Sequence, residues 1–299
     1  MSLLSIVRAC GGDLYAGGRR ANIPAPGHSR QDRSVSLWLQ DGRVFVHSFG
    51  AADWREVMQD LRARGLVDAE GGLTGAPGTA PPRAPEPSES ERIEAARRLW
   101  SEARPLAGTL SERHLQRRRV ERPNAGAALR HHAAVPAAIY TRRGATWPAL
   151  LAAIHDPAGA LTAVEVTYLD RQARRLERRG LGRKTIGRVR PGSAVRLDPP
   201  GSELMVGEGV FTTLSAAARF GLPGWALLSI RNLKAWTPPA GVRRVLIAAD
   251  RGRYGETAAE VLRDRLTASG VGVTVEIPPP PFGDWNEAEA LDDESMARG

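Results

Sequence analysis

The sequence contains almost no cysteine. Cys10 is the single cysteine among 299 residues, so an internal disulfide framework is excluded and no cysteine cluster is present to bind zinc. A chain so poor in cysteine is typical of the reducing cytoplasm, and we expect that localisation. No apolar run approaches the roughly 20 residues that cross a bilayer, so we expect no membrane partner.

Lysine is also scarce, with Lys184 and Lys234 as the only two. The formal net charge is nevertheless +9, so arginine supplies nearly all of the positive charge. A coding bias towards Arg, Ala, Gly and Pro explains arginine in place of lysine, but it does not explain the excess of positive over negative charge. Two interpretations stay open: a surface for a polyanion, because guanidinium binds phosphate in a bidentate way, or a solvated charged surface.

One segment has nothing with which to build a core. Residues 71–90, GGLTGAPGTAPPRAPEPSES, are rich in Gly, Pro, Ala and Ser, which is typical of a flexible linker. We therefore expect a small module over 1–70, a linker over 71–90, an α+β segment over 91–200 and an α/β domain over 201–299.

The first module reads as a hairpin followed by a helix. Alternating apolar residues flank Asp41-Gly42, a strong signal for a two-residue hairpin turn. Asp53 is placed to cap a following helix with apolar residues at helical spacing. The core expected for this module is Trp38, Val44, Val46, Trp54 and Leu61.

The second segment begins with a helix, SESERIEAARRLWSEA, opened by a Ser-x-x-Glu capping pattern. Two strands follow around the turn at 156–159. An arginine-rich stretch, 171–190, then comes between two strands, and it is either a solvated loop or a surface that follows phosphates.

From Glu203 onward, apolar strands alternate with helices. The expected strands are ELMVGEG, GWALLSI, RRVLIAAD and VGVTVEIP, and Gly221 and Gly270 end the two main helices. Ala258, Val261, Leu262 and Leu266 are expected to form the buried face of the second helix. This pattern predicts a parallel sheet covered on both faces.

Three acidic residues follow strand ends in this domain: Glu208, Asp250 and Asp284. Parallel strands bring their carboxyl ends to one edge, where ligands gather. Each residue alone would be explained as a helix cap or a loop acid. Together they predict an oxygen-rich site for Mg²⁺ or Mn²⁺, which keeps waters and bridges to phosphates.

These motifs, VGEG…LS, IAAD…G and GDWNE, resemble a Toprim domain, and most closely that of primases from phages and mobile elements. The resemblance implies that Glu208 is the general acid/base and that Asp250 and Asp284 bind metal. Gly255 matches the glycine of the family, and Asn286 belongs to its D-x-N motif.

The resemblance continues upstream, in HLQRRRV, TWPALLAAIHDPAGALTAVEVTYLD and KTIGRVRPGSAVRL. It implies a primase segment that holds single-stranded DNA template and ribonucleotides, with Thr167 and Tyr168 in its substrate-facing part. The residues expected to bind nucleic acid or nucleotide are Arg130, Arg183, Lys184, Arg188, Arg251 and Asn286. No G-x-x-x-x-G-K-[ST] loop occurs, so a separate replicative helicase would have to supply any unwinding.

The sequence departs from the family at its ligand positions. The N-terminal module resembles a zinc ribbon in which Ala25, Ser48 and Ala52 stand where cysteines would be and only His28 remains. Zinc needs four ligands at a structural site, so we expect no zinc. In the Toprim half, Gly252 replaces the second Asp of D-x-D and Phe211 replaces the second Glu of E-x-x-E. Arg251 and Arg253 are candidates to neutralise phosphate charge instead.

Four functions remain in competition. The first is a metal-dependent primase that makes short RNA primers on single-stranded DNA. The second is a degenerate Toprim module that binds nucleic acid or a replication partner without chemistry. The third is a Toprim nuclease, which the primase-like upstream segment disfavours. The fourth is an unrelated α/β protein, for which the three acids and the upstream match would have to coincide by chance.

Overall fold

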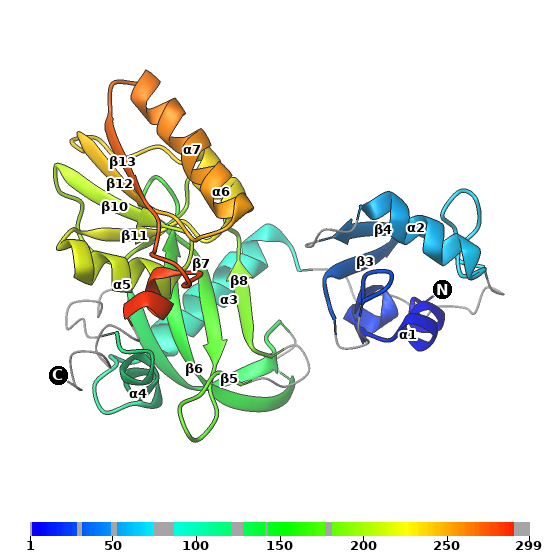
Figure 1. Ribbon diagram of the computed structural model, residues 1–299. Helices are drawn as coiled ribbons and strands as arrows, with labels where there is room; N and C mark the ends of the chain where they lie inside the picture. The colour runs from blue at the N-terminus through cyan, green and yellow to red at the C-terminus, as the bar shows by residue number, and fades with distance from the viewer. Residues whose placement is uncertain are drawn as a thin grey trace. The chain divides into compact units, whose positions relative to one another are not determined.

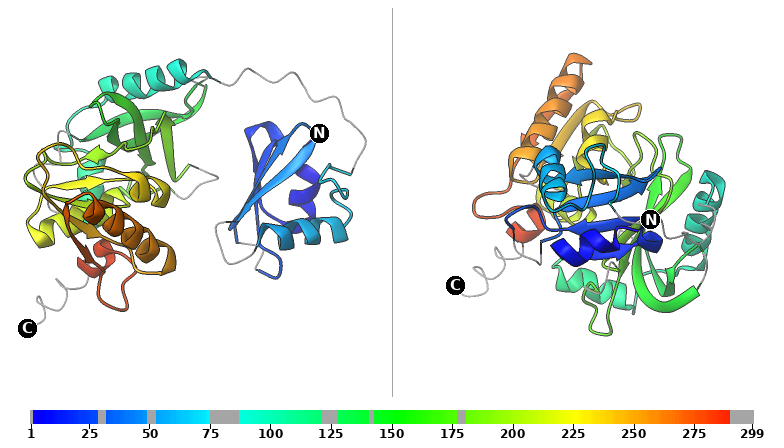
Figure 2. Two further views of the ribbon diagram at one scale, coloured as in Figure 1. Left: turned by 90° about the horizontal axis from the view of Figure 1, so that it is seen from above. Right: turned by 90° about the vertical axis from the view of Figure 1, so that its right-hand side faces the viewer.

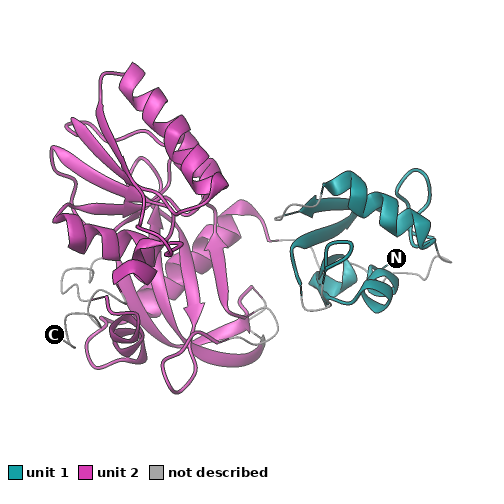
Figure 3. Ribbon diagram, in the orientation of Figure 1, with its two compact units in different colours: residues 1–86 teal, residues 87–299 magenta. Residues whose placement is uncertain are grey.

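The computed structural model describes residues 2–28, 32–48, 53–74, 87–120, 128–140, 143–176 and 181–289. The chain divides into two compact units, Met1–Glu86 and Pro87–Gly299 (Figure 3). Most of the segment expected as a linker, 75–86, lies outside the described residues, as do Ala52 and the arginines at 178 and 179.

Unit 1 is built on an antiparallel sheet in the order β1-β2-β3-β4. The hairpin at Asp41-Gly42 is confirmed, and both turn residues have positive φ, as a type I′ turn requires. Asp53 caps the following helix in a full capping box with Glu56. The elements are α1 (Leu4–Cys10), β1 (Asp13–Tyr15), η1 (Ala16–Gly18), β2 (Arg20–Ile23), β3 (Val35–Gln40), β4 (Arg43–Ser48) and α2 (Trp54–Ala63).

The core expected for unit 1 was partly wrong. Val44 and Leu61 are buried and Val46 packs against them, but Trp54 is 51% exposed. Trp54 is the first residue of α2, and the Arg55 guanidinium lies 4.9 Å from its ring centroid. Trp38 points to the opposite face of the sheet, because alternation along β3 gives the core to Val35, Leu37 and Leu39.

The first half of unit 2 is built on an antiparallel sheet in the order β5-β6-β7-β8. Its strands are β5 (Leu129–Ala138), β6 (Arg143–His155), β7 (Leu161–Tyr168) and β8 (Arg183–Gly187). Helix α3 (Glu89–Glu102), opened by the expected capping box of Ser88 and Glu91, covers one face. Leu115 of α4 (Leu110–Arg117) and Leu214 pack on the other face, which joins this sheet to the C-terminal domain.

The C-terminal domain is the expected parallel sheet flanked by helices. The strand order is β13-β12-β10-β11-β9, with only β9 antiparallel among these strands. The elements are β9 (Val195–Arg196), β10 (Glu203–Gly207), α5 (Val210–Phe220), β11 (Gly224–Ala226), α6 (Ile230–Ala235), β12 (Arg244–Ala248), α7 (Arg253–Ala268) and β13 (Gly272–Glu276). Nowhere in the described ranges is a helix both long and apolar enough to cross a membrane.

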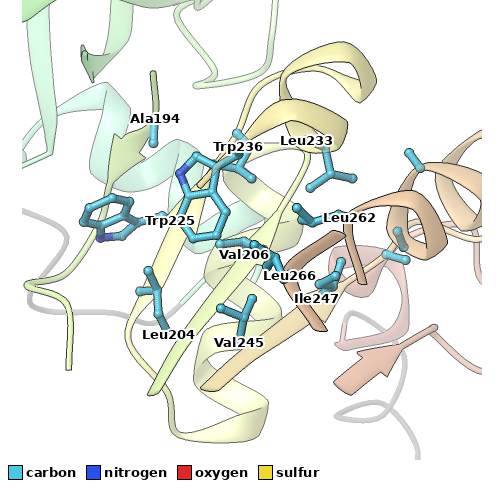
Figure 4. Packing of buried hydrophobic residues seen from close by; sticks show 14 of the residues in the cluster. Ala194, Leu204, Val206, Trp225, Leu233, Trp236, Val245, Ile247, Leu262 and Leu266 are labelled. Atoms are coloured by element: carbon cyan, nitrogen blue, oxygen red, sulfur yellow. The ribbon is translucent and has the colours of Figure 1, made fainter. Parts of the chain in front are cut away.

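Alternation along the central strands divides the two layers of this domain. Val206 and Ile247 point towards α6 and α7, where Leu262 and Trp236 complete a buried cluster (Figure 4). Met205 points to the other face and packs with Ala217 of α5. Helices α5 and α7 therefore lie on opposite sides of the sheet (Figures 1 and 2), and the carboxyl ends of the strands stay open between them.

The buried face of α7 yields a stability test. Leu262 is fully buried, whereas Val261, which the sequence placed on the same face, is 42% exposed. Leu262→Ala should therefore lower the free energy of unfolding by about 2–5 kcal/mol, while Val261→Ala should change it by less than about 0.5 kcal/mol. Urea denaturation of both variants measures the difference, and equal losses would contradict the packing described here.

Candidate active site

Parallel pairing brings acidic side chains from different strands to one edge. Glu208 directly follows β10 and Asp250 follows β12, and β10 and β12 are neighbours in the sheet. Asp284 lies in the loop after β13, which pairs with β12. All three line one cleft of about 1220 Å³, so the structure brings together the acids expected at the strand ends.

The opposite wall of the cleft comes from the antiparallel sheet and α4. Ala163, Glu165 and Thr167 lie on the same face of β7, because side chains alternate along a strand. Ala163 is part of the core, and Glu165 and Thr167 line the cleft. Arg183 of β8 lies opposite Thr167 and its guanidinium is 3.7 Å from the Glu165 carboxylate. The basic residues that line the cleft are Arg117, Arg118, Arg174, Arg175, Arg183 and Lys184.

Asp250 carries the most perturbed carboxyl group in the cleft. Burial raises its pKa to about 6, and repulsion from the Glu208 and Asp284 carboxylates adds to the shift, while a hydrogen bond with Thr212 opposes it. Its Oδ1 atom is buried and finds no hydrogen-bond partner among the described residues. A buried oxygen without a donor is costly, and this one is available to a cation.

Glu208 and Glu165 are also shifted towards the protonated form. Burial raises the pKa of Glu208, which is partly offset by the charge of Arg183 and by a hydrogen bond from the Ile230 backbone N–H. Burial likewise raises the pKa of Glu165 against the opposing charge of Arg183. Arg183 therefore acts on acids from both walls of the cleft.

Asp284 is held in place by the short helical segment 285–289. Its Oδ1 accepts the Glu287 backbone N–H at 2.8 Å, so it caps this segment. The buried Asn286 side chain donates to the Arg118 carbonyl at 2.8 Å and to Ser215 Oγ at 2.9 Å. Asn286 thus ties the Asp284 loop to α4 and α5, which makes it a positioning residue at the edge of the cleft.

The backbone at Gly252 explains why no second carboxylate follows Asp250. Gly252 has φ 120° and ψ 157°, a conformation that is essentially restricted to glycine. Its N–H donates to the Glu256 carboxylate at 2.9 Å, so that side chain covers the start of α7. Three residues on, a Cβ at Gly255 would lie 2.5 Å from the Asp250 carbonyl oxygen. Glycines at positions 252 and 255 therefore allow the backbone to pass close to Asp250.

Phe211, which stands where the family pattern has a second glutamate, packs between the side chains of His114 and Arg118. Its ring meets the His114 ring edge-on at a centroid distance of 5.4 Å, and the Arg118 guanidinium lies over it at 4.9 Å. Burial lowers the pKa of Arg118, and the charges of Asp284 and Glu287 oppose that shift. Phe211 therefore supports the half-buried guanidinium of Arg118 near the carboxylates of Asp284 and Glu287.

Three of the residues expected to bind nucleic acid have other contacts. Arg130 stacks over Trp100 and donates to its carbonyl. Arg188 is 3.7 Å from Glu89, and Arg251 donates to the Pro278 carbonyl. None of these three lines the cleft, and their binding role stays a prediction.

Lys184 lies along the cleft but its ammonium group turns away. The ammonium donates to the Ala137 carbonyl at 3.1 Å and lies 5.7 Å from the Tyr168 ring. Tyr168 itself is fully buried, with its hydroxyl on the Pro136 carbonyl. Arg118 and Glu165 were not expected from the sequence. The i, i+4 spacing of His114 and Arg118 and the period of two along β7 are the signals that could have found them.

The residues at the rim fit a magnesium ion that takes few ligands from the protein. The described residues contain no group of three or more His, Cys, Asp or Glu side chains arranged to enclose an ion. Asp250 nevertheless offers an oxygen, Oδ1, that accepts no hydrogen bond from the described residues. A bound cation would also reduce the repulsion of Asp250 by Glu208 and Asp284. Mg²⁺ commonly binds through one or two carboxylates, waters and substrate phosphates.

Comparison with protein families assigns the two halves of unit 2. Residues 203–291 match the model of the Toprim domain, in the part of the chain whose motifs resemble it. Residues 90–197 match a domain of unknown function. Unit 2 therefore consists of a region similar to the Toprim domain and an α+β region before it.

Several solved structures that match are those of primases. The Aquifex aeolicus primase, with its zinc-binding and RNA polymerase domains, has 13% identity and a TM-score of 0.48, covering 100% of this chain and 82% of that one. The primase fragment of the bacteriophage T7 primase-helicase has 17% identity and a TM-score of 0.42, covering 65% and 74%. The E. coli primase catalytic core has 12% identity and a TM-score of 0.44, covering 70% and 78%. A search of curated proteins gives no match.

Restoring the second acid should fail because of the backbone at Gly252. Gly252→Asp places a side chain at φ 120° and should lower stability by about 1–3 kcal/mol. Gly209→Asp is the matched control, because Gly209 lines the same cleft, has φ −93°, and is the N-cap of α5. An aspartate is favourable at an N-cap. Thermal denaturation should rank Gly252→Asp clearly below Gly209→Asp, and the reverse order would contradict this account.

The raised pKa of Asp250 predicts a pH-dependent stability in metal-free protein. The folded state holds this proton up to about pH 6, so stability falls as the pH rises from about 4 through 6. Asp250→Asn should therefore be more stable than the wild type at about pH 8, by about 1–2 kcal/mol after allowance for solvent screening, with little difference at about pH 4.

Urea denaturation in EDTA at the two pH values measures this difference. Asp264→Asn is the control, since the Asp264 side chain is 70% exposed on α7. An Asp250→Asn variant that loses stability at the higher pH would refute the buried, repelled carboxylate.

Proposed function

We propose that this protein is a primase-type nucleotidyltransferase that makes short RNA primers on single-stranded DNA during replication. The observation that carries the proposal is the meeting of Glu208, Asp250 and Asp284 with an arginine-lined wall in one cleft of a Toprim domain. We expect it to act in the cytoplasm and to depend on a separate replicative helicase.

The charges of the cleft suit two polyanions, a template strand and a nucleoside triphosphate. Arg174 and Arg175 enter from the stretch before β8, and Arg118 enters from the end of α4. Arginine remains charged and can bind phosphate oxygens in pairs. A volume of about 1220 Å³ exceeds the usual range for a single small-molecule site, so the cleft has room for both ligands.

The three acids take two different parts in the proposed reaction. The 3′-hydroxyl of the primer loses its proton to Glu208 and its oxygen forms a bond to the α-phosphorus, while the bond to pyrophosphate breaks. The raised pKa of Glu208 suits a base that must take a proton near neutral pH. Asp250 and Asp284 would hold Mg²⁺ or Mn²⁺, which supplies positive charge to the transferring phosphoryl group.

The guanidinium groups supplement that charge. Gly252 and Phe211 remove two acids that the family pattern would place here, so the rim offers fewer ligands to a metal. Arg118, held over Phe211, and Arg183, beside Glu165, are fixed charges that need no metal. We expect them to bind the triphosphate and to stabilise charge in the transition state.

The test is incorporation of labelled ribonucleotides on single-stranded DNA with Mg²⁺ and with Mn²⁺. Wild-type protein should give short, metal-dependent products, and Asp250→Ala should reduce product formation by at least about 100-fold. Arg118→Gln should also reduce it, and the loss should appear mainly in the apparent affinity for ribonucleotide if Arg118 binds the triphosphate.

Arg263→Gln is the control, because Arg263 pairs with Glu260 and Asp264 on the outer part of α7 and does not line the cleft. Wild-type protein that binds DNA but makes no product would refute the enzyme and leave the degenerate binding module. Degradation of the template in place of synthesis would support the nuclease.

A further inference from the structure

One wall of the cleft carries a polar cluster whose chemistry differs from that of the arginines around it. Strands β7 and β8 are neighbours in the antiparallel sheet (Figure 1). Glu165 and Thr167 of β7 lie opposite Thr185 and Arg183 of β8, and all four residues line the cleft. Directly opposed residues in such a pair have Cβ atoms about 5 Å apart on one face of the sheet. These four side chains therefore form a polar square.

Alternation along the two strands separates the polar square from the core and from the lysine beside it. Val166 and Tyr168 of β7 are fully buried in the cluster that packs against α3. On β8, Lys184 lies opposite Val166, and its ammonium donates to the Ala137 carbonyl. Because successive side chains point to opposite faces, the cleft receives one acid, one guanidinium and two hydroxyl groups from this wall.

Glu165 is the enclosed charge of the polar square. Its side chain is 13% exposed, against 50% for Arg183. The Arg183 Nη1 atom is 3.7 Å from the Glu165 Oε1 atom, a distance at which the two charges attract but no hydrogen bond forms. Burial raises the pKa of Glu165 against the charge of Arg183, so the ionised carboxylate is stabilised less than it would be in water. A ligand that donates a hydrogen bond would stabilise it.

The composition of the polar square favours an uncharged ligand that is rich in hydroxyl groups. A phosphate would be repelled by the Glu165 carboxylate, and a base would find no ring among these four side chains on which to stack. A sugar hydroxyl donates to a carboxylate, and threonine hydroxyls both donate and accept. Dinucleotide-binding folds use the same chemistry, since an acidic side chain there accepts the ribose 2′-hydroxyl.

The polar square shares the cleft with the proposed general base. The charge of Arg183 opposes the rise in pKa of Glu208 as well as that of Glu165, so Arg183 lies within electrostatic reach of a carboxylate on each wall. Glu208 and the polar square line the same cleft. A ribose whose 3′-hydroxyl approaches Glu208 carries its 2′-hydroxyl on the adjacent carbon, which brings that group to the wall formed by β7 and β8.

We propose that the polar square holds the ribose of the nucleotide that supplies the 3′-hydroxyl, with Glu165 accepting a hydrogen bond from the 2′-hydroxyl and Thr167 and Thr185 contacting the same sugar. Glu165 then selects ribonucleotide over deoxyribonucleotide at this position, and Arg183 orients its carboxylate. The inference rests on the proposed function, because it takes Glu208 as the group that receives the 3′-hydroxyl proton.

The test compares two primers that differ by one oxygen atom. An RNA primer on a DNA template ends either in a ribonucleotide or in the matching 2′-deoxyribonucleotide, and extension by one labelled ribonucleotide gives kcat/KM for each end. Wild-type protein should prefer the ribonucleotide end by about 10–100-fold, as expected for a hydrogen bond to a charged group. Glu165→Leu should reduce the preference to less than about threefold, by slowing extension of the ribonucleotide end alone. Glu165→Gln keeps an uncharged acceptor and should show an intermediate preference.

The two threonines of β7 supply a matched pair of variants. Thr167 and Thr162 are both buried, but Thr162 does not line the cleft, and its hydroxyl has no partner among the described residues. Thr167→Val should lower the preference for the ribonucleotide end, and Thr162→Val should leave it unchanged. A preference that Glu165→Leu leaves intact, or a change in the preferred base with no change in the preferred sugar, would overturn the assignment.

An equilibrium measurement on the same primers distinguishes failure of this site from failure of the proposed function. Fluorescence anisotropy with Ca²⁺ in place of Mg²⁺, and without nucleoside triphosphate, gives Kd for each primer end. Tighter binding of the ribonucleotide end that is lost in Glu165→Leu would support the sugar site even in a protein that makes no product. Equal extension of both ends by the wild type would refute the sugar site and leave the primase. Equal Kd values in a protein that makes no product would refute both.

Discussion

Parallel pairing of β10 with β12 is the constraint on which the cleft depends. Five residue pairs in register, from Glu203 opposite Arg244 to Gly207 opposite Ala248, end both strands at the same level. The chain then continues into Glu208 on one strand and Asp250 on the other, so two half-buried carboxylates face each other. Burial raises the pKa values of both groups, and repulsion from Glu208 adds to the shift of Asp250. The clusters on both faces of the sheet supply the stability that maintains this unfavourable arrangement.

The positions that depart from the family pattern are built into the surrounding structure. Gly252 allows a backbone conformation that an aspartate would strain, and Phe211 packs between His114 and Arg118. At both positions, the structure around the residue differs from that of a site in which an acid alone has been lost. The edge of the sheet that bears Glu208, Asp250 and Asp284 has fewer carboxylates than the family pattern, and it lies opposite a wall of arginines. This arrangement suits ligands with many phosphate groups and a metal ion that takes few ligands from the protein.

Much of the fold could be predicted because its signals are local. The Asp41-Gly42 turn, the capping boxes at Asp53 and Ser88, and the alternation of apolar strands with helices each follow from adjacent residues. The meeting of Glu208, Asp250 and Asp284 could also be anticipated, because the ends of parallel strands share one edge.

What could not be predicted depends on contacts between distant segments. Trp38 and Trp54 were expected in the core, but the faces of β3 and α2 that pack against the rest of unit 1 leave Trp38 partly exposed and Trp54 51% exposed. The side chains of Arg130 and Arg251 contact backbone carbonyls instead of the cleft. Arg118 lines the cleft beside Phe211 and Asn286, which are far from it in sequence, and only its i, i+4 spacing from His114 could have pointed to it.

The most direct test of the account is a titration of the full chain with Mn²⁺ in which the free ion is measured by electron paramagnetic resonance. The cleft should bind a single ion, more tightly when a nucleoside triphosphate is present, since water and phosphate supply most ligands at such sites. Asp250→Asn should abolish that binding, and Asp264→Asn should leave it unchanged. Binding that persists in Asp250→Asn, or wild-type protein that takes up no ion with or without triphosphate, would contradict the central claim that the strand ends form a metal and phosphate site.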